Sequence, residues 1–475
     1  MARSTPMRPA DVAWLRMDTP VNPMSITGVM TLGTPVSLER AAKLFDERLL
    51  IFERFRQRVR GRGGAAPRWK LVPGFTAIDA FEAVQLADPD SKEEFQRLVS
   101  RRMSGQVPLD KPGWDVLHVE HYRGGSALVI RIHHAIGDGI ALMHVLLSMA
   151  DEAFDPSNVP PPEPDAPEAP PEPADDDYFA LASRIASRTA KLAGKALLVG
   201  AGAIEAAKGE AGRIVRSPGR LVRHAEQGLS IGAALSKIGL MAADSETIFK
   251  RGVTGTKHVA WTDAFAVSQV KAIGEASGAK INDVLLSAAT GALRRYLAGR
   301  GESTDGVEMR VAVPVNLRPL EQAYRLGNDF GLVFLSLPVG IEDPAGRLAE
   351  LKRRMDRLKH SAEAGVTLGV LQTIGLAPPA VHEAVVEILG AKTSGVMTNV
   401  PGPRERLHLG GSPITGLVFW VPQTGEIGLG LSIFSYAGDV RVGVATDDRI
   451  APDPEKITAG VRDEIAFLTK HYGVA

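Results

Sequence analysis

The amino-acid sequence predicts a mixed α/β protein built as two lobes, and three observations lead to this prediction. Strand and helix patterns alternate on both sides of one unusual stretch, Asp151–Asp177. That stretch carries ten acidic residues, no Lys or Arg, and the run VPPPEPDAPEAPPEP. Because proline lacks a backbone donor and like charges repel, we expect an extended, poorly ordered linker. The chain has 475 residues, which is enough for two or three domains at about 100–200 residues each. Hydrophobic residues make up 44% of it, which is enough for a substantial core.

Residues 1–150 form the first predicted lobe, before the linker at 151–177. Alternating apolar residues indicate strands, and apolar residues at helical spacing indicate helices. The expected strands are Ser25–Leu32, Val116–His121 and Leu128–His133, and the expected helices are Leu38–Leu50, which begins after Ser37, and Ile140–Ala150. The glycine-containing turn Tyr122–Ser126 suits a hairpin between two of these strands.

Residues 178–250 form a segment rich in Ala and Gly with spaced basic side chains, and residues 251–475 form the second predicted lobe. The expected strands in this lobe are Lys257–Phe265, Met309–Val315, Gly331–Pro338, Ser394–Asn399, Ile414–Val421, Gly428–Ser435 and Val440–Thr446. The expected helices are Ser268–Ser277, Ile281–Ala298, Ala345–His360 and Pro454–His471. An enzyme with two comparable lobes usually has its site in the cleft between them.

Composition and charge narrow the classes of function. The formal net charge is zero, so no global attraction to nucleic acid is expected. The chain has no cysteine, which removes disulfides, thiolate metal sites and cysteine nucleophiles. The N-terminus lacks the apolar run of a secretory signal, and no uncharged apolar run of about 18 residues appears. We therefore expect a cytoplasmic protein with no membrane-spanning helix.

The segment His133-His134-Ala135-Ile136-Gly137-Asp138-Gly139 is the strongest candidate site. It follows an apolar strand and precedes an apolar helix, so the two histidines should point to opposite faces of the strand. One would face the core and the other a cavity. A neutral imidazole is suited to removing the proton of an alcohol, because its usual pKa is about 6.5. Asp138 could anchor the turn, and Gly139 would let a substrate approach closely.

Two other interpretations of the histidine pair are open on these residues alone. The two histidines could simply end the strand with their polar groups hydrogen-bonded, and have no chemical role. It could also bind zinc, although HExxH is absent and adjacent strand residues point apart. No metal site is therefore predicted.

The segment HHAIGDG matches the HHxxxDG signature of the CoA-dependent acyltransferase superfamily, which includes chloramphenicol acetyltransferase, carnitine acyltransferases and the condensation domains of peptide synthetases. Further elements resemble, in order, those of the bacterial wax ester synthase/diacylglycerol acyltransferases. These elements are NPMSITGVMTL with Met24 after Pro23, Pro108–Asp115 (PLDKPGWD), Ile281–Val284 (INDV), Val313–Arg318 (VPVNLR), Asn399–Pro403 (NVPGP) and Ser435–Asp439 (SYAGD). One element departs from the family pattern PLDxxxPLW, because Pro-Gly-Trp stands where Pro-Leu-Trp is usual.

The resemblance implies two chloramphenicol-acetyltransferase-like lobes with an active-site tunnel between them. It implies that His134 is the general base, that His133 is mainly structural and that Asp138 holds the loop. Transfer would occur directly in a ternary complex, with acyl-CoA as a co-substrate and no cofactor. The acceptor would be a fatty alcohol or diacylglycerol, giving wax esters or triacylglycerol.

Other residues are assigned supporting roles in the same site. Asn282 is the candidate donor to the tetrahedral oxyanion, and the alternative is that it caps the helix that starts nearby. Asp283 accompanies it in the ND pair. Arg318 either pairs with a carboxylate between the lobes or lies on the surface. The candidate substrate-binding residues are Trp114, Asn399, Pro401 and Gly402.

The stretch from Tyr178 to Ala225 carries nine Lys or Arg against two Glu and is amphipathic at its start. It could attach the protein peripherally to the inner membrane or to lipid droplets, where long-chain alcohols and diacylglycerol reside. The alternative is a helix packed between the lobes with solvated basic residues. Two alternative functions stay open: acyl transfer to a polyketide or carrier-bound acceptor, and non-catalytic lipid binding on the same scaffold.

Overall fold

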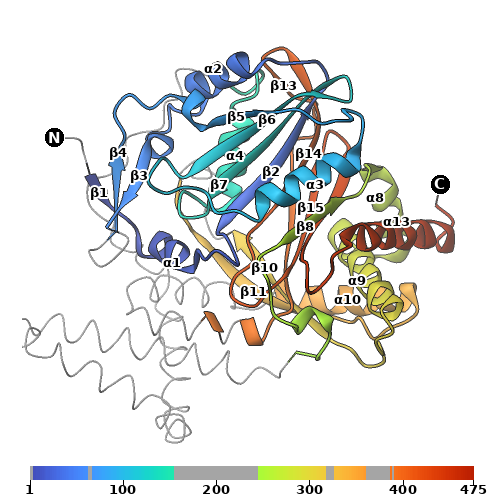
Figure 1. The fold of residues 1–475 in the computed structure, drawn as a ribbon. Coiled ribbons are helices and arrows are strands. Elements are labelled where there is room, and N and C mark those ends of the chain that lie inside the picture. The colour runs from blue at the N-terminus through green and yellow to red at the C-terminus, as the bar shows by residue number, and fades with distance from the viewer. Residues whose placement is uncertain are drawn as a thin grey trace, which may run out of the picture.

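The computed structural model describes residues 4–61, 67–154, 244–316, 326–359, 386–387 and 390–474. Within these ranges the chain forms two large mixed sheets, a small three-stranded sheet and helices packed on the outside (Figure 1). The predicted α/β class is thus confirmed. None of the helices in these ranges is long and apolar enough to cross a membrane.

The N-terminal half contains β1 (Ser4–Pro6), α1 (Pro9–Met17), β2 (Ser25–Leu32), α2 (Leu38–Arg48), η1 (Glu53–Arg56), β3 (Gln57–Arg60), β4 (Arg68–Leu71), η2 (Ala77–Ala80), β5 (Phe81–Val84), α3 (Lys92–Met103), β6 (Trp114–Tyr122), β7 (Gly125–His133) and α4 (Gly139–Ser148). The predicted strand Ser25–Leu32 is confirmed at both ends. Helix α2 begins after Ser37, whose side chain accepts a hydrogen bond from the N–H of Arg40, as the predicted cap requires. The hairpin between β6 and β7 turns at Arg123 and Gly124, both with positive φ, which suits a tight two-residue turn.

The C-terminal half contains η4 (Ile248–Lys250), β8 (Lys257–Trp261), β9 (Phe265–Ala266), α8 (Val267–Ser277), α9 (Ile281–Gly299), β10 (Met309–Asn316), β11 (Phe330–Leu337), α10 (Pro344–Lys359), β12 (Gly395–Pro401), β13 (His408–Leu409), β14 (Ser412–Trp420), β15 (Leu429–Tyr436), β16 (Asp439–Asp447) and α13 (Pro454–His471). The predicted single strand Lys257–Phe265 is wrong in one respect, because the chain leaves the sheet at Thr262 and returns as β9. The other predicted strands and helices of this half are present within a few residues.

The two large sheets divide the molecule differently from the predicted boundaries. The first sheet has the order β13-β14-β2-β7-β6-β5, and the second has the order β11-β10-β12-β15-β16-β8, with β9 also on β16. Strand β14 therefore leaves the second lobe and pairs antiparallel with β2 of the first, with Val418 opposite Val29. The first lobe consequently includes residues 408–420 in addition to the described residues of the range 1–150.

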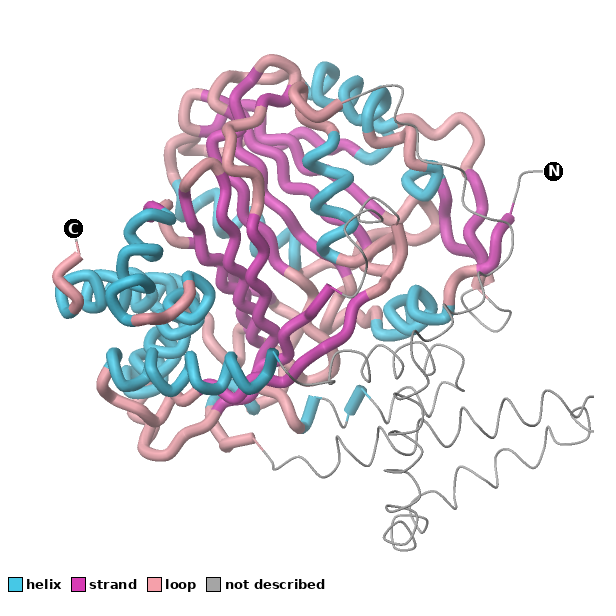
Figure 2. Tube along the Cα trace, turned by 180° about the vertical axis from the view of Figure 1, so that it is seen from behind, coloured by secondary structure: helices cyan, strands magenta, loops and turns pink. Residues whose placement is uncertain are grey.

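Three hydrophobic clusters lie on different faces of the two sheets. One packs α1, α2 and α4 against the first sheet, and another packs α8, α9, α10 and α13 against the second. These four helices form one group beside the strands in both Figure 1 and Figure 2. The third cluster joins α3 to both sheets through large side chains such as Phe95, Trp261 and Trp420. The two lobes therefore share a packed core and are held together by this packing as well as by the linker.

The predicted linker begins inside the folded lobe. The Asp151 carboxylate accepts hydrogen bonds from the N–H groups of Gly410 and Gly411 and pairs with Arg48 at 2.6 Å. Glu152 accepts a hydrogen bond from the N–H of His408. Residues 151–154 are thus fixed against the β13–β14 turn, and residues 155–177 and the basic stretch 178–225 lie outside the described residues.

Candidate active site

Strand β7 carries the histidine pair to the boundary between the lobes. It pairs with β2 so that His133 lies opposite Ser25, and the N–H of His134 donates to the carbonyl of Met24 at 2.7 Å. Both rings are buried, with exposed fractions of 1% and 4% for the two residues. Their surroundings are nevertheless different.

The ring of His133 is held by groups of the first lobe. Its Nδ1 accepts a hydrogen bond from the N–H of Ala135 at 3.1 Å, so the proton of the neutral ring belongs on Nε2. That nitrogen lies 3.8 Å from the Asp18 carboxylate. Asp18 in turn accepts from the N–H of Met24 and from the Gln106 amide. This arrangement ties the strand end to the preceding loop and fits a structural role.

The ring of His134 is held by a residue of the second lobe. Its Nδ1 lies 2.9 Å from Oδ1 of Asn328. The orientation of this amide follows from its nitrogen, which donates to the Asp11 carboxylate and to the carbonyl of His134, each at 2.9 Å. Since Oδ1 of Asn328 can only accept, Nδ1 of His134 carries the proton. The lone pair of the neutral ring is therefore on Nε2, where a base would use it.

Asp11 connects this network to helix α1. Its carboxylate also accepts the backbone N–H of Asn328 at 3.1 Å, and Arg54 lies 3.8 Å away as a counter-ion. Both Asp11 and Arg54 are buried, at 0% and 4% exposure. A buried carboxylate is tolerated because it is paired and hydrogen-bonded in this way. The chain of contacts runs from α1 through Asn328 to the His134 ring.

Aromatic side chains enclose His134. The indole of Trp14 stacks on its ring at 4.1 Å between centroids, with an interplanar angle of 21°, and Phe330 lies 5.6 Å away. Burial lowers the pKa of His134 to about 3, because a charged imidazolium would lose its hydration, while the hydrogen bond to Asn328 acts in the opposite direction. The free imidazole is thus neutral across the physiological pH range.

Asp138 fixes the loop after the histidines, as predicted from its position. One carboxylate oxygen caps α4 by accepting the N–H of Ala141 at 2.9 Å. The other accepts the N–H of Asp329 at 3.1 Å, and the N–H of Asp138 donates to the carbonyl of Gly327. The carboxylate therefore holds α4 and the Gly327–Asp329 segment of the other lobe together.

An apolar cavity begins at Gly139 and lies between α4 and the first sheet. Along α4 it is lined at helical spacing, by Gly139, Leu142, Met143, Leu146 and Leu147. Strands of the first sheet and β15 supply the opposite wall, with Ile26, Gly28, Val29, Met30, Ile130, Ile132, Leu417, Val418, Phe419 and Phe434. No residue that lines this cavity is charged. Such a cavity suits a hydrocarbon chain.

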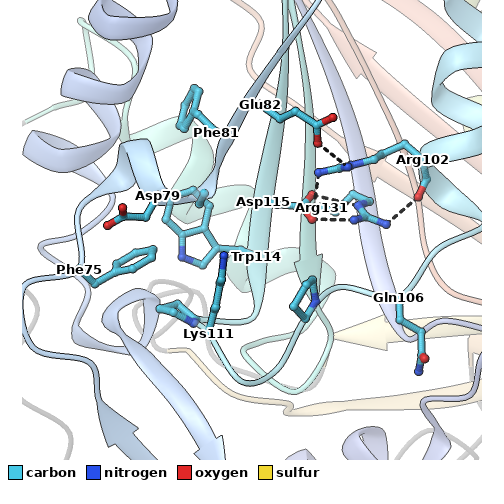
Figure 3. Close-up of a pocket in the computed structure, with 13 residues that line it drawn as sticks. Phe75, Asp79, Phe81, Glu82, Arg102, Gln106, Lys111, Trp114, Asp115 and Arg131 are labelled. Carbon is cyan, nitrogen blue, oxygen red and sulfur yellow. Dashed lines mark hydrogen bonds and ion pairs between the residues drawn. The ribbon is translucent and has the colours of Figure 1, made fainter.

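A second cavity, beside β6, has the opposite character (Figure 3). Arg131 pairs with Asp115 through two hydrogen bonds of 2.6 and 2.9 Å, and Arg102 joins Asp115 to Glu82. Trp114 and Phe75 line the other side, with Lys111 near them. Because most of these charges pair with one another, we interpret the ion pairs as a brace between α3, β6 and β7.

The structure places the remaining predicted site residues apart from this centre or on its border. Trp114 is buried, and its indole N–H donates to the carbonyl of Phe55, while one edge borders the polar cavity. Asn399 is half-buried on β12 and its Nδ2 is enclosed without a hydrogen-bond partner among the described residues. Pro401 ends β12, and Gly402 follows in close contact with Phe434, which lines the apolar cavity. Arg318 lies outside the described residues.

Asn282 is exposed in the first turn of α9, within the helix group of the second lobe. In the described part of the chain no contact joins its amide to the surroundings of His134, so this geometry does not support the predicted oxyanion role. The predicted capping role is wrong, because Lys280 occupies the cap position and Asp283 accepts its N–H at 2.9 Å.

Sequence reasoning missed Asn328, Asp11 and Trp14. The only local signal is the dipeptide Asn328-Asp329 after a glycine, just before a strand. Within the described residues, no three His, Asp or Glu side chains gather in a way that could hold a metal ion.

Comparison with known proteins places this chain in a family. Residues 7–285 match the model of the wax ester synthase/diacylglycerol acyltransferase catalytic domain, and residues 326–469 match the corresponding C-terminal domain. A probable diacylglycerol O-acyltransferase of Mycobacterium tuberculosis is 25% identical over 439 residues, covering 89% of this chain and 86% of that protein. Wax ester synthase/diacylglycerol acyltransferase 11 of Arabidopsis thaliana is 26% identical over 479 residues, covering 93% of this chain and 90% of that protein.

Solved structures show the same fold. The wax ester synthase/diacylglycerol acyltransferase of Marinobacter aquaeolei VT8 aligns with a TM-score of 0.66 at 20% identity, covering 99% of this chain and all of that one. The first condensation domain of the CDA synthetase aligns with a TM-score of 0.55 at 14% identity, covering 99% and 96% of the two chains. The two-lobed fold inferred from the HHxxxDG resemblance is confirmed, and the chain belongs to the wax ester synthase/diacylglycerol acyltransferase family of acyltransferases.

Proposed function

We propose that this protein transfers a long-chain acyl group from acyl-CoA to the hydroxyl group of a fatty alcohol or of diacylglycerol. The observation that carries the proposal is the state of His134, a neutral imidazole whose Nδ1–H is held by Asn328 and whose Nε2 has no hydrogen bond from the described residues. The family supports acyl transfer, and the apolar cavity beside Gly139 supports a long hydrocarbon chain as part of the substrate.

In the proposed reaction, Nε2 of His134 removes the hydroxyl proton as the alcohol oxygen attacks the thioester carbonyl. The tetrahedral intermediate collapses, the C–S bond breaks, and the proton on Nε2 passes to the leaving CoA sulfur. The two substrates must then be bound together, because no acyl-enzyme is formed. The chain has no cysteine that could form a thioester intermediate, which agrees with direct transfer. A positioned imidazole of this kind accelerates such a step about 10²–10⁴-fold.

Because Asn328 belongs to the second lobe and His134 to the first, the proposed reaction depends on both lobes. The amide that orients His134 precedes β11, whereas His134 and Asp11 belong to the first lobe. The base is therefore correctly oriented only when the lobes are packed together. Asp138 strengthens the same junction through the N–H of Asp329.

Release of free thiol by the purified protein tests the proposed function. Palmitoyl-CoA should release CoA in the presence of hexadecanol or a diacylglycerol, with the ester recovered as the second product. Long-chain amines and short polar alcohols serve as comparison acceptors. Equal or better activity with an amine would favour the carrier-type acceptor instead, and no release with any donor and acceptor would favour a lipid-binding protein.

Attachment to a membrane or lipid-droplet surface stays a prediction from the basic stretch Tyr178–Ala225, which lies outside the described residues. We propose that this stretch brings the enzyme to its lipid acceptors. Sedimentation with anionic liposomes should decrease when residues 178–225 are deleted, provided that the shortened protein keeps its thermal unfolding transition. Unchanged sedimentation would contradict the proposal.

A further inference from the structure

The wall that the first sheet presents to the apolar cavity has one gap in its row of side chains. Along β2, the residues on this face are Ile26, Gly28 and Met30, because side chains alternate along a strand. The neighbours of Gly28 across the sheet are Ile130 on β7 and Phe419 on β14. A glycine thus lies between four large apolar side chains, at a position where a strand usually favours a β-branched or aromatic residue.

Neither packing nor backbone conformation requires this glycine. A Cβ atom at Gly28 would have one heavy atom within 4 Å, the carbonyl oxygen of Val418 at 3.9 Å, which is an ordinary contact. Gly443, also in a strand, is different, because a Cβ there would lie 2.7 Å from Oγ of Ser432 and 2.9 Å from Nε1 of Trp420. Gly28 also has no positive φ angle. The space above Gly28 is therefore open and continuous with the cavity.

The depth of this space follows from the strand register. Ser25 lies opposite His133, and Ile26 lies opposite Ile132, so Gly28 is three residues further along β2 from the histidines. At about 3.3 Å per residue, this places Gly28 roughly 10 Å from the level of the histidine pair. Met30 is the next residue on the same face of β2, two positions further from the histidines, and Leu417 lies opposite it. A chain that enters beside Gly139 passes Gly28 before it reaches Met30.

We propose that the cavity between α4 and β2 holds the acyl chain of the donor and that Gly28 determines how long a chain it accepts. This inference rests on the proposed function and adds the part of the protein that sets donor specificity. A side chain at position 28 would block the cavity at mid-depth, so only short acyl groups would fit. Shortening the side chain of Met30 would extend the cavity in the opposite direction.

The experiment compares the wild-type protein with Gly28→Ala, Gly28→Val, Gly28→Leu and Met30→Ala. Specificity constants for butanoyl-CoA and palmitoyl-CoA are measured with one alcohol. Gly28→Leu should lower kcat/KM for palmitoyl-CoA at least about tenfold relative to butanoyl-CoA, as expected for extra methylenes in a hydrophobic pocket. The alanine and valine variants should give intermediate ratios, and Met30→Ala should favour the longer donor.

Three outcomes would overturn the proposal. If Gly28 only affects folding, the ratio of kcat/KM for palmitoyl-CoA and butanoyl-CoA would be unchanged. Thermal unfolding of each variant would then show the loss of stability. Full activity of Gly28→Leu with palmitoyl-CoA would show that the acyl chain lies elsewhere. Sensitivity to the length of the alcohol, with the donor kept constant, would assign the cavity to the acceptor.

A binding measurement separates this proposal from the proposed function. Equilibrium binding of palmitoyl-CoA and butanoyl-CoA to the same variants requires no turnover. If the wild-type protein binds acyl-CoA but transfers nothing, the proposed reaction fails, and the binding ratio of Gly28→Leu still decides the role of Gly28. Loss of palmitoyl-CoA binding with retained butanoyl-CoA binding supports the proposal, and equal binding of both contradicts it.

Discussion

The surroundings of His133 and of His134 differ in the way that separates a structural histidine from a chemical one. His133 uses its Nδ1 lone pair to accept the N–H of Ala135 and directs Nε2 towards Asp18. His134 uses its Nδ1–H to donate to Asn328 and keeps the Nε2 lone pair. Two adjacent rings thus hold opposite tautomers, and the partner of each ring determines which one it has.

The two surroundings also differ in which lobe supplies them. The partners of the His133 ring, Asp18 and Ala135, are in the first lobe, whereas Asn328 comes from the segment before β11. Trp14 and Phe330 enclose His134 from both lobes as well. The comparison shows that a sequence can predict which strand carries a functional side chain, while a residue distant in the sequence determines the tautomer of that side chain.

The largest expected effect is that of replacing the proposed base. His134→Gln keeps a side chain of similar size that can still hydrogen-bond to Asn328, but it cannot accept a proton. We expect kcat/KM in the thiol-release assay to fall by about 10²–10⁴-fold. Circular dichroism and the thermal transition serve as controls for folding. A folded variant with more than half of the wild-type activity would show that the two histidines do not differ in the way described.

A smaller effect is expected when the orienting amide is removed. Asn328→Ala leaves Nδ1 of His134 without its acceptor and should reduce kcat about 10²-fold with a smaller change in KM, since a misplaced catalytic group can cost this much. The matched control is the exchange of both partners, Asp11→Asn together with Asn328→Asp, which keeps one carboxylate and one amide in the network.

The double variant should retain more activity than Asp11→Asn or Asn328→Asp alone, because it keeps one carboxylate facing one amide, whereas Asn328→Asp alone places two carboxylates together. Additive losses would mean that the Asp11–Asn328 contact has no part in orienting the ring. Wild-type activity of Asn328→Ala would remove the distinction between the two histidines that rests on their partners.

The smallest effect on turnover is expected at the structural histidine. His133→Gln should change kcat/KM less than about tenfold but should lower the free energy of unfolding by about 1–3 kcal/mol, because a buried donor or acceptor loses its partner. Urea unfolding and the thiol-release assay measure the two quantities on the same preparation. A loss of activity as large as that of His134→Gln, with unchanged stability, would make His133 a second chemical group.

The elements around the site were predictable to different degrees. Strand β2 and the end of β7 were predicted from alternating apolar residues, and the role of Asp138 in the loop followed from its place before α4. Helix α3 was missed, although Ser91 and Glu94 give it a capping signal and Phe95 begins its apolar face. The short strands β1, β3, β4 and β5 have three or four residues each, too few for a period to show.

The pairing of distant segments was not predictable from one sequence. Strand β14 was expected as a strand, but its local pattern does not indicate that it pairs with β2 of the other lobe. Asn328 was missed for the same physical reason, because its role depends on a contact with a residue 194 positions away. Asn282 was preferred as a donor on local pattern alone, and the structure exposes it on α9.

The most direct test of the account is the protonation state of the His134 ring. Nitrogen-15 NMR of histidine-labelled protein resolves Nδ1 and Nε2, and the His134 signals are identified by their absence from the His134→Gln protein. Because burial lowers the pKa of His134 to about 3, the ring should stay neutral from about pH 8 down to about pH 5. Over that range, Nδ1 should carry the proton and Nε2 should not. A proton on Nε2 of the neutral ring, or titration of the ring near its usual pKa of about 6.5, would contradict the assignment of Nε2 as the base.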